Sequence, residues 1–552
     1  MPNEPTEILV KDISLPVGTT PEEACAEAAK RLSLSSSELI RADIHRRSID
    51  ARRRGGKDPT FVFSVNVSCR VSDKKLERLK ALRGIEIIHR EPLVIPRAKS
   101  DIRPVIVGFG PAGMFAALIL AESGMRPIVI ERGANVKERQ AAVDSFMRTG
   151  VLDTSTNIQF GAGGAGTFSD GKLVTRINDP ICRYVLEKFH EFGAPEEILT
   201  LAKPHVGTDR LLDVVGNIEK RVASLGGEIR FLTRLDDMRI NNGKVESITV
   251  EDNNGRYDLK TDALILAVGH SARDTFDMLS GKGIDMIVKP FSVGVRVEHL
   301  QADLDHSLYG KFADMSDKYG RPLLPHAEYN VSWREKQQGL VSDTARGVYS
   351  FCMCPGGEVV AATSEEGGVV TNGMSRYARD GRNGNSAIAV SVLPEDIGKD
   401  WKKAIEFQRM IERSAFRAGG NDYSAPVETL GDFLSGKTSR FTEPSRVVPT
   451  YMNGKYRLCD IGGIFPGFVT DMLRKGFRRF GGMIKGFDMP EAVLTGAETR
   501  TSSPVRIPRN DGFTTSKVGN LYPCGEGAGY AGGITSAAVD GIRTAIMVIG
   551  NN

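Results

Sequence analysis

A glycine-rich turn between a short apolar strand and an apolar helix is the first feature of the sequence that could do chemistry. Residues 103–113 contain the spacing Gly-x-Gly-x-x-Gly. Gly108 allows the tight turn, Gly110 lets the backbone approach a pyrophosphate, and Gly113 lets the helix pack closely on the strand. The N–H groups at the start of such a helix bind phosphate oxygens. The residues that we expect to bind a dinucleotide here are Gly108, Gly110, Pro111, Ala112 and Gly113.

An acidic residue follows the next predicted strand. Residues 127–130 form a short apolar run, and Glu131 comes 18 residues after Gly113. A carboxylate at this position accepts hydrogen bonds from the two hydroxyls of a ribose, and each charge-assisted hydrogen bond contributes about 1.5–3 kcal/mol. An acid here favours an unphosphorylated ribose, as in FAD or NAD. We include the neighbouring Arg132 in the predicted cofactor site.

The C-terminal part of the sequence decides between FAD and NAD. Residues 516–526 resemble the second nucleotide-binding sequence of flavoproteins, although Glu526 stands where Asp is usual. The helix that starts near Gly533 can stabilise negative charge on a reduced flavin with its N-terminus. A dehydrogenase that binds only NAD needs no such C-terminal segment to complete its nucleotide-binding domain, so we expect FAD. The further cofactor-binding residues that we expect are Leu235, Ala267, Gly269, Gly525, Glu526, Gly532, Gly533 and Ile534.

A second Gly-x-Gly-x-x-Gly spacing, at residues 161–166, leaves two interpretations open. The first is a separate NAD(P)-binding domain. Against it, residues 154–160 do not form a clean apolar strand, and residues 167–172 do not form an apolar helix. The second, which we favour, is a loop along the FAD pyrophosphate and flavin, with Lys172 near the phosphates or the flavin N5/O4 edge. The residues expected to bind FAD from this loop are Gly164, Gly166, Thr167, Phe168, Ser169, Asp170, Gly171 and Lys172.

Two cysteines and an arginine join Lys172 as candidates for catalysis. Cys352 and Cys354 lie two residues apart, so both thiols face one side of a strand. They either pack beside the Pro-Gly-Gly turn that follows or line the flavin pocket. Arg296 shares a strand face with Glu298, and these two residues form either an ion pair or part of an anion-binding site. No Cys or His pair has the spacing of a zinc site, so we expect no metal.

Other polar residues of the middle region are ambiguous. Arg376, Asp380 and the segment 500–506 could recognise an acidic or phosphorylated substrate or could form structural ion pairs. His299 and His326 could donate protons, but a lone histidine is more typical of a structural role. The sequence therefore predicts pocket residues without identifying a catalytic acid or base.

Composition and charge exclude several classes of protein. A hydrophobic content of 40% and a charged content of 26% are typical of a globular chain, and 60 glycines indicate many tight turns. Residues 1–103 hold 20 Lys and Arg against 15 Asp and Glu, which leaves the remainder nearly neutral and speaks against a nucleic-acid partner there. Seven scattered cysteines fit a reducing compartment. Residues 104–121 are uncharged, but glycines interrupt them, and no signal peptide precedes them, so we expect a cytosolic protein without membrane contact.

The pattern of strands and helices predicts an α/β fold with a discontinuous Rossmann-like FAD-binding domain. Residues 1–98 read as a small basic α+β module, with strands at 7–15 and 60–68 and a helix start near Thr20. The segment 92–104 resembles a linker. Residues 99–285 and 515–552 form the two parts of the FAD-binding domain, and residues 286–514 form an inserted α+β substrate domain.

Five longer strings identify a family. Three lie at residues 163–172, 289–299 and 350–357, and two at 372–381 and 498–506. With these strings, nearly the whole chain resembles the bacterial family described as uncharacterised FAD-dependent dehydrogenases, within the flavoproteins that share a glutathione-reductase-like FAD domain. The resemblance implies FAD, a basic N-terminal module and an inserted substrate domain, but no particular substrate.

Three functions follow from these observations. The first is an FAD-dependent oxidoreductase that transfers hydride between the flavin and a small anionic substrate, with NAD(P)H docking transiently or an organic substrate as the reductant. The second is an RNA-linked flavoprotein of the tRNA-modification type that uses the basic residues 41–57. The third is a flavin-holding sensor without turnover. We favour the first, and the sequence leaves the oligomeric state open.

Overall fold

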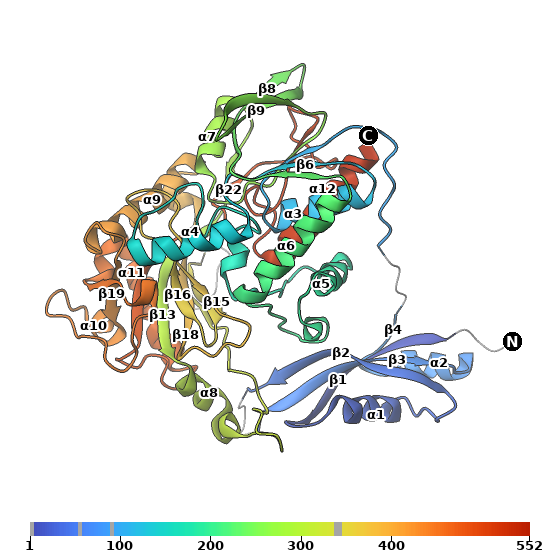
Figure 1. The fold of residues 1–552 in the computed structure, drawn as a ribbon. Coiled ribbons are helices and arrows are strands. Elements are labelled where there is room, and N and C mark those ends of the chain that lie inside the picture. Colours follow the sequence, from blue (N-terminus) through green and yellow to red (C-terminus); the bar gives the residue numbers. More distant parts are fainter. Residues whose placement is uncertain (1–4, 53–57, 89–92, 336–344, 552) are drawn as a thin grey trace.

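A five-stranded parallel sheet lies where the sequence predicts the FAD-binding domain (Figure 1). Its order is β23-β11-β5-β6-β7, so the strand nearest the C-terminus is hydrogen-bonded to one that precedes the predicted insertion. This arrangement confirms the predicted fold class. The structure is a computed structural model, which describes residues 5–52, 58–88, 93–335 and 345–551. The strands are β5 (Val105–Val107), β6 (Ile128–Ile130), β7 (Glu228–Arg230), β11 (Leu264–Leu266) and β23 (Leu521–Pro523).

The parallel sheet is covered on both faces because its strands alternate between two apolar cores. Ile106, Val129 and Ile265 pack against helices, while Val105 and Leu264 face a small antiparallel sheet. The helices are α3 (Pro111–Glu122), α5 (Ile181–Glu191), α6 (Thr208–Ser224) and α12 (Ile534–Asn551). The opposite face is covered by β8 (Arg234–Asn241), β9 (Lys244–Asp252), β10 (Gly255–Lys260) and α7 (Arg273–Gly281).

The inserted region is built on a seven-stranded mixed sheet of order β14-β15-β18-β13-β21-β19-β20. A small hairpin, β16 (Glu358–Ala361) with β17 (Thr371–Met374), contributes to the same region. The strands are β13 (Phe291–Leu300), β14 (Ser332–Arg334), β15 (Gly347–Cys354), β18 (Asn383–Val392), β19 (Ala425–Thr429), β20 (Tyr456–Leu458) and β21 (Val493–Glu498). The helices are α8 (Gln301–Tyr309), α9 (Trp401–Ala418), α10 (Leu430–Ser435) and α11 (Gly467–Gly481).

Two further elements connect these layers. The short antiparallel pair of β12 (Ile287–Val288) and β22 (Val505–Arg506) brings together the two ends of the inserted region. Helix α4 (Val136–Thr149) follows β6 and begins at Asn135, whose side chain accepts hydrogen bonds from two backbone N–H groups of its first turn. Figure 1 shows α4 running beside the inserted sheet.

The N-terminal module is an antiparallel sheet of order β2-β3-β1-β4 with two helices on its apolar face. The predicted strands and the helix start are confirmed, and Thr20 forms a capping box with Glu23. The edge strand β2 is not free: the backbone of Arg47 exchanges hydrogen bonds with Thr200 and Ala202. The elements are β1 (Thr6–Pro16), α1 (Pro21–Arg31), β2 (Leu39–Asp50), β3 (Thr60–Cys69), α2 (Asp73–Lys80) and β4 (Ile85–Ile87).

Two predictions for the first part of the chain have partial outcomes. The uncharged stretch 104–121 forms β5, the glycine turn and most of α3, and no helix among the described residues is long and apolar enough to cross a membrane. Of the basic stretch 41–57, residues 53–57 lie outside the described residues, as does the start of the predicted linker. The predicted domain boundaries stay predictions.

Candidate active site

A large pocket opens at the carboxyl ends of the parallel strands and extends to residues of the inserted region. Its empty volume is about 1510 Å³, part of which is open to solvent. Such crevices are where open α/β sheets bind their ligands. The sequence-predicted residues that line it are Gly108, Gly110, Pro111, Ala112, Glu131, Arg132, Gly164, Gly166, Ser169, Asp170, Lys172, Leu235, Ala267, Gly269, Cys352, Cys354, Glu526, Gly532, Gly533 and Ile534.

The glycine turn after β5 is held by close backbone contacts. Gly108 has a φ of +101°, and a Cβ atom there would lie 2.4 Å from the carbonyl oxygen of Ala267. A Cβ atom at Gly164 would lie 2.9 Å from the Cα atom of Gly110, so two glycine segments meet at the pocket wall. Helix α3 has no side-chain cap, which leaves its first N–H groups available to a ligand. This cradle of bare backbone fits a pyrophosphate.

Glu131 is buried next to this turn. Its Oε2 atom accepts a hydrogen bond from the Phe109 N–H at 2.8 Å, and its Oε1 atom accepts from the N–H groups of Gly133 and Gly161 at 3.0 and 2.9 Å. These three bonds fix the carboxylate, while Oε2 keeps a lone pair for one more donor. The position agrees with the predicted contact to a ribose.

Arg139 shapes the second glycine loop, and the sequence analysis missed it. Its guanidinium is fully buried and donates hydrogen bonds to the carbonyls of Asn157 and Ile158 at 3.0 and 2.9 Å, and also to those of Gly161 and Ala162. Burial lowers the pKa of Arg139 to about 10. An arginine at the end of the first turn of an ordinary helix gives no sequence signal for this role.

The second glycine segment is not another Rossmann turn. Residues 154–160 form no strand, and a single 3-10 turn, Ala165–Phe168, takes the place of a helix. The segment lines the same pocket as the first turn, in agreement with the favoured interpretation.

Six of the predicted site residues lie behind the pocket lining and support its walls; they are Gly113, Thr167, Phe168, Gly171, Gly525 and Arg296.

Lys172 lines the pocket but is held by protein groups. Its Nζ atom lies 3.0 Å from Glu328 Oε2 and 3.8 Å from Asp170 Oδ2, and it donates a hydrogen bond to the carbonyl of Met353. Although burial opposes the charge, the two carboxylates raise the pKa of Lys172. The ammonium group therefore stays charged at the pocket wall.

Cys352 and Cys354 both line the pocket. This position agrees with the sequence interpretation in which the two thiols line the flavin pocket. The pairing of β15 with β18 is interrupted by a bulge after Phe351, and Cys352 has a φ of +43°. The bulge turns three residues of the strand, Phe351 and both cysteines, toward the pocket. The Cys352 side chain is exposed at the pocket wall, while Cys354 is buried.

Arg296 forms its ion pair with a different carboxylate from the one considered in the sequence analysis. Its guanidinium contacts Glu498 through two hydrogen bonds of 3.0 Å, and it also donates to Asn372 and Asn385. Glu298 instead accepts hydrogen bonds from Asn383 and Thr450. The pairing of β13 with β21 brings Arg296 next to Glu498, and sequence spacing cannot show this long-range partner. Arg296 is fully buried and orients Asn372 and Glu498, which do line the pocket.

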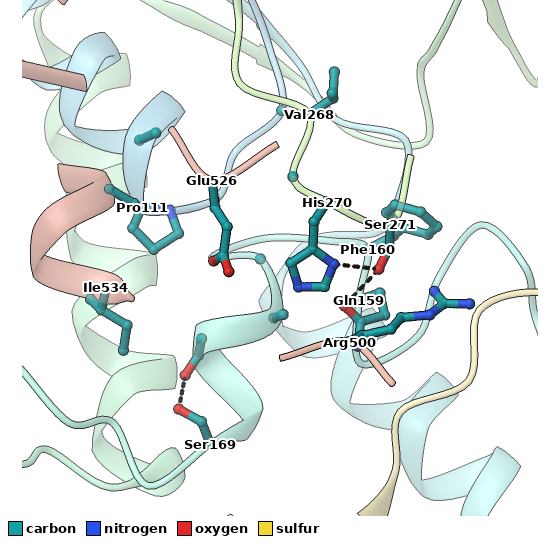
Figure 2. Close-up of a pocket in the computed structure, with 18 of the residues that line it drawn as sticks. Pro111, Gln159, Phe160, Ser169, Val268, His270, Ser271, Arg500, Glu526 and Ile534 are labelled. Atoms are coloured by element: carbon teal, nitrogen blue, oxygen red, sulfur yellow. Dashed lines mark hydrogen bonds between the residues drawn. The ribbon is translucent and has the colours of Figure 1, made fainter. Parts of the chain in front are cut away.

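His270 is the pocket histidine, and the sequence analysis missed it in favour of His299 and His326. It directly follows Gly269 of the predicted cofactor site, and its Nδ1 atom lies 3.1 Å from Ser271 Oγ (Figure 2). His299 is buried against the Phe487 carbonyl, and His326 contacts Asp305, so both are structural. The signal that could have found His270 is its place directly after Gly269 at a strand's carboxyl end.

Arg500 lines the same part of the pocket as His270. It is paired with Glu412, which it contacts at 3.1 and 3.2 Å, and Glu412 is also paired with Arg273 of α7. This buried network joins α7 and α9 to the segment after β21. The sequence analysis noted segment 500–506 as ambiguous, and the structure shows that its first arginine reaches the pocket.

Glu526 faces the pocket from the turn after β23 (Figure 2). Burial raises its pKa to about 7, and the nearby Lys289 opposes this shift. Gly532 and Gly533 lie near it at the start of α12, where added Cβ atoms would meet no other atoms within 4 Å. This bare helix terminus leaves room for a flat ring system and fits the flavin end of FAD.

Comparisons with known proteins identify the parts of the chain. A family model described as FAD-dependent protein, C-terminal domain-like, matches residues 290–501. A model described as pyridine nucleotide-disulphide oxidoreductase matches residues 102–294, and a domain of unknown function matches residues 8–68.

Two relatives and one solved structure are similar to the chain. A Clostridium beijerinckii protein named "Uncharacterized protein" is 45% identical over 523 residues, which cover 94% of each chain. Aklavinone 12-hydroxylase DnrF of Streptomyces peucetius is 30% identical over 145 residues, 25% of this chain and 29% of the hydroxylase. The flavin-dependent brominase Bmp2 aligns with a TM-score of 0.38 and 13% identity over 82% of this chain and 80% of the brominase.

The pocket and the comparisons agree on the cofactor. The glycine cradle, the buried Glu131 and the open start of α12 fit FAD. Of the two larger family models, one describes FAD-dependent proteins and the other describes pyridine nucleotide-disulphide oxidoreductases. The Clostridium relative matches almost the whole chain. The chain therefore belongs to the family of FAD-dependent proteins with this C-terminal domain, and it is an FAD-dependent oxidoreductase.

Proposed function

We propose that the pocket binds FAD with its pyrophosphate at the start of α3 and its flavin toward the start of α12. Glu131 Oε2 accepts a hydrogen bond from a ribose hydroxyl. The segment Gly164–Gly166 lies along the cofactor. Arg139 fixes the residues just before that segment by donating hydrogen bonds to the carbonyls of Gly161 and Ala162. When bound, FAD supplies the two-electron chemistry by accepting or donating a hydride. The chain's own residues bind and orient the cofactor and the substrate, and they exclude water from the pocket.

The substrate in this proposal is a small anionic molecule that enters from the inserted region. One observation carries the proposal: the pocket that contains the dinucleotide cradle continues to Phe351, Cys352, Asn372 and Arg500 of the insertion. A cofactor and a substrate bound in one continuous pocket can come into contact for hydride transfer. Arg500 brings a guanidinium to this wall and favours an acidic group, whereas Glu328 and Asp170 already balance the charge of Lys172.

The test is an anaerobic titration of the purified yellow protein with NADPH and then NADH, following the visible flavin band. Rapid bleaching is expected if a nicotinamide docks transiently as the electron donor. A band that bleaches only with organic acids supports an organic reductant instead. Protein that neither retains nor rebinds FAD contradicts the proposed function.

The RNA-linked alternative has less support. Arg41 and Arg52 of the basic stretch form ion pairs with Asp43 and Asp50. Arg47 lies over the ring of Phe61, at 5.5 Å from its centroid, and its backbone pairs with residues 200–202. These contacts engage basic groups that would otherwise be available to bind RNA phosphates. Absence of RNA retention in a filter-binding assay at physiological salt would remove this alternative.

A further inference from the structure

A chain of hydrogen bonds fixes the protonation state of His270. The Gln159 Nε2 atom donates to the carbonyl of Ala362 at 3.2 Å, and this contact orients the amide, because a carbonyl only accepts. Ser271 Oγ donates to Gln159 Oε1 at 3.0 Å. The serine hydrogen is therefore used, so Ser271 Oγ accepts from His270 Nδ1 at 3.1 Å. Nδ1 carries the ring proton, and Nε2 is a bare acceptor.

The bare Nε2 atom belongs to a ring that faces the pocket. Figure 2 shows His270 between Glu526 on one side and Gln159 and Arg500 on the other. Burial and the neighbouring cations Arg500 and Arg273 lower the pKa of His270 to about 3. The imidazole therefore stays neutral over the physiological pH range and offers a lone pair to a donor.

A positive charge lies beside this acceptor. The ion pairs behind the pocket wall join Arg273, Arg409 and Arg500 to Glu365 and Glu412. Three guanidinium groups thus share two carboxylates, which leaves one positive charge in a cluster whose inner members are Arg273, Arg500 and Glu412. Arg500, whose side chain is only 3% exposed, is the arginine of this cluster that reaches the pocket. An anion placed there would balance the charge.

We propose that His270 and Arg500 recognise the substrate, and that the substrate is a hydroxy acid. Arg500 binds the carboxylate or phosphate group, and His270 Nε2 accepts the hydrogen bond of a hydroxyl on the adjacent carbon. A buried acceptor discriminates against an analogue that lacks the donor, because the acceptor is then left unpaired. This assignment rests on the proposed function and specifies its substrate class.

Paired probes test the assignment on the FAD-loaded protein. Glycolate is compared with acetate, and malate with succinate, by the shift that each causes in the visible flavin spectrum. One hydrogen bond to a neutral group corresponds to about a tenfold preference for the hydroxy acid of each pair. His270→Ala is expected to remove this preference while acetate and succinate bind as before. Arg500→Lys is expected to weaken all four probes, because an ammonium cannot contact Glu412 and the anion at once with the spread donors of a guanidinium.

Controls separate recognition from folding. His326→Gln alters a histidine that contacts Asp305 outside the pocket lining, and it should leave the preference unchanged. Nitrogen-15 spectra of the imidazoles, which need no ligand, should show His270 as the neutral Nδ1–H form even if an arginine variant does not fold.

Several results would overturn the assignment. Equal binding within each pair, no saturable binding of either hydroxy acid, or an Nε2–H form of His270 contradicts it while the proposed function stands. His270→Ala could lose FAD affinity while the remaining FAD-loaded protein still prefers hydroxy acids. That result would show that His270 contacts the cofactor and not the substrate. Failure of the wild-type protein to bind FAD would instead contradict the proposed function.

Discussion

The two walls of the pocket are built from different materials. One wall, formed by the turn after β5, the second glycine segment and the start of α12, consists mainly of backbone that approaches the ligand site. The other wall, from the inserted region and the end of β11, consists of side chains held by long-range ion pairs, such as Arg296 with Glu498 and Arg500 with Glu412. The first wall fits the cofactor, which is the same whatever the substrate. The side chains of the second wall can differ with the substrate.

This difference explains how each wall tolerates change. A backbone wall fails where an added Cβ atom would meet a neighbouring carbonyl, as at Gly108, because that carbonyl cannot move away. A side-chain wall fails when one partner of a buried pair is removed, because the other charge is left without compensation. Substitutions of the two kinds should therefore give different signatures in cofactor binding and in stability.

The largest effect is expected for Gly108→Ala in the backbone wall. The new Cβ atom would lie 2.4 Å from the Ala267 carbonyl oxygen at a φ of +101°, so the turn must shift. Because a backbone carbonyl blocks the new atom, the cradle should not form, and the purified variant should retain no bound FAD. Gly216→Ala in α6, where nothing lies within 4 Å, should keep FAD affinity and raise helix stability slightly. Equal FAD affinity in both variants would contradict the distinction between the walls.

The second effect concerns the side-chain wall. Arg296→Met leaves Glu498 buried without its partner, and the free energy of unfolding should fall by about 3–5 kcal/mol in urea titrations of the FAD-free protein. Lys517→Ala breaks a pair with Asp285 in which both side chains are 55% exposed, and it should change stability by less than about 1 kcal/mol. Similar losses in the two variants would show that the buried pair does not hold the wall.

The smallest effect is a pH dependence at Glu526, where the two walls meet. Burial raises the pKa of this carboxyl from 4.5 to about 7 in the folded chain. Between these values the folded state holds a proton that the unfolded state has lost, so the stabilisation present below pH 4.5 disappears as the pH rises through 7. Glu526→Gln removes this dependence. Unfolding curves at pH 5 and pH 8 should show the variant gaining on the wild type at the higher pH, and a constant difference would refute the assignment.

The backbone wall was largely predictable from the sequence. Glycines at 108, 110 and 113, the acid at 131 and the small residues at 532–533 act locally, within one turn or one strand end. Their spacing alone therefore indicates the cradle, and the fold class follows from the same segments. The supporting role of Arg139 was missed because its four carbonyl partners belong to a loop at residues 157–162, which has no periodic pattern.

The side-chain wall was predictable only in part. Cys352, Cys354 and Lys172 were found because they stand in distinctive local strings. The partner of Arg296 could not be found, because Glu498 lies 202 residues away and is brought close only by strand pairing. The role of His270 depends likewise on Gln159, at a separation of 111 residues from it in the sequence.

The position of β23 in the central sheet has a consequence for biosynthesis. This strand pairs with β11, and α12 packs directly on α3, with Gly541 against the backbone of Ala112. Residues 521–551 leave the ribosome only after the whole inserted region, so the nascent chain cannot close the cofactor cradle while translation of that region continues. The insertion must fold beside an incomplete parallel sheet whose β11 edge is still open. The completed FAD cradle is therefore available only after the inserted region has been synthesised.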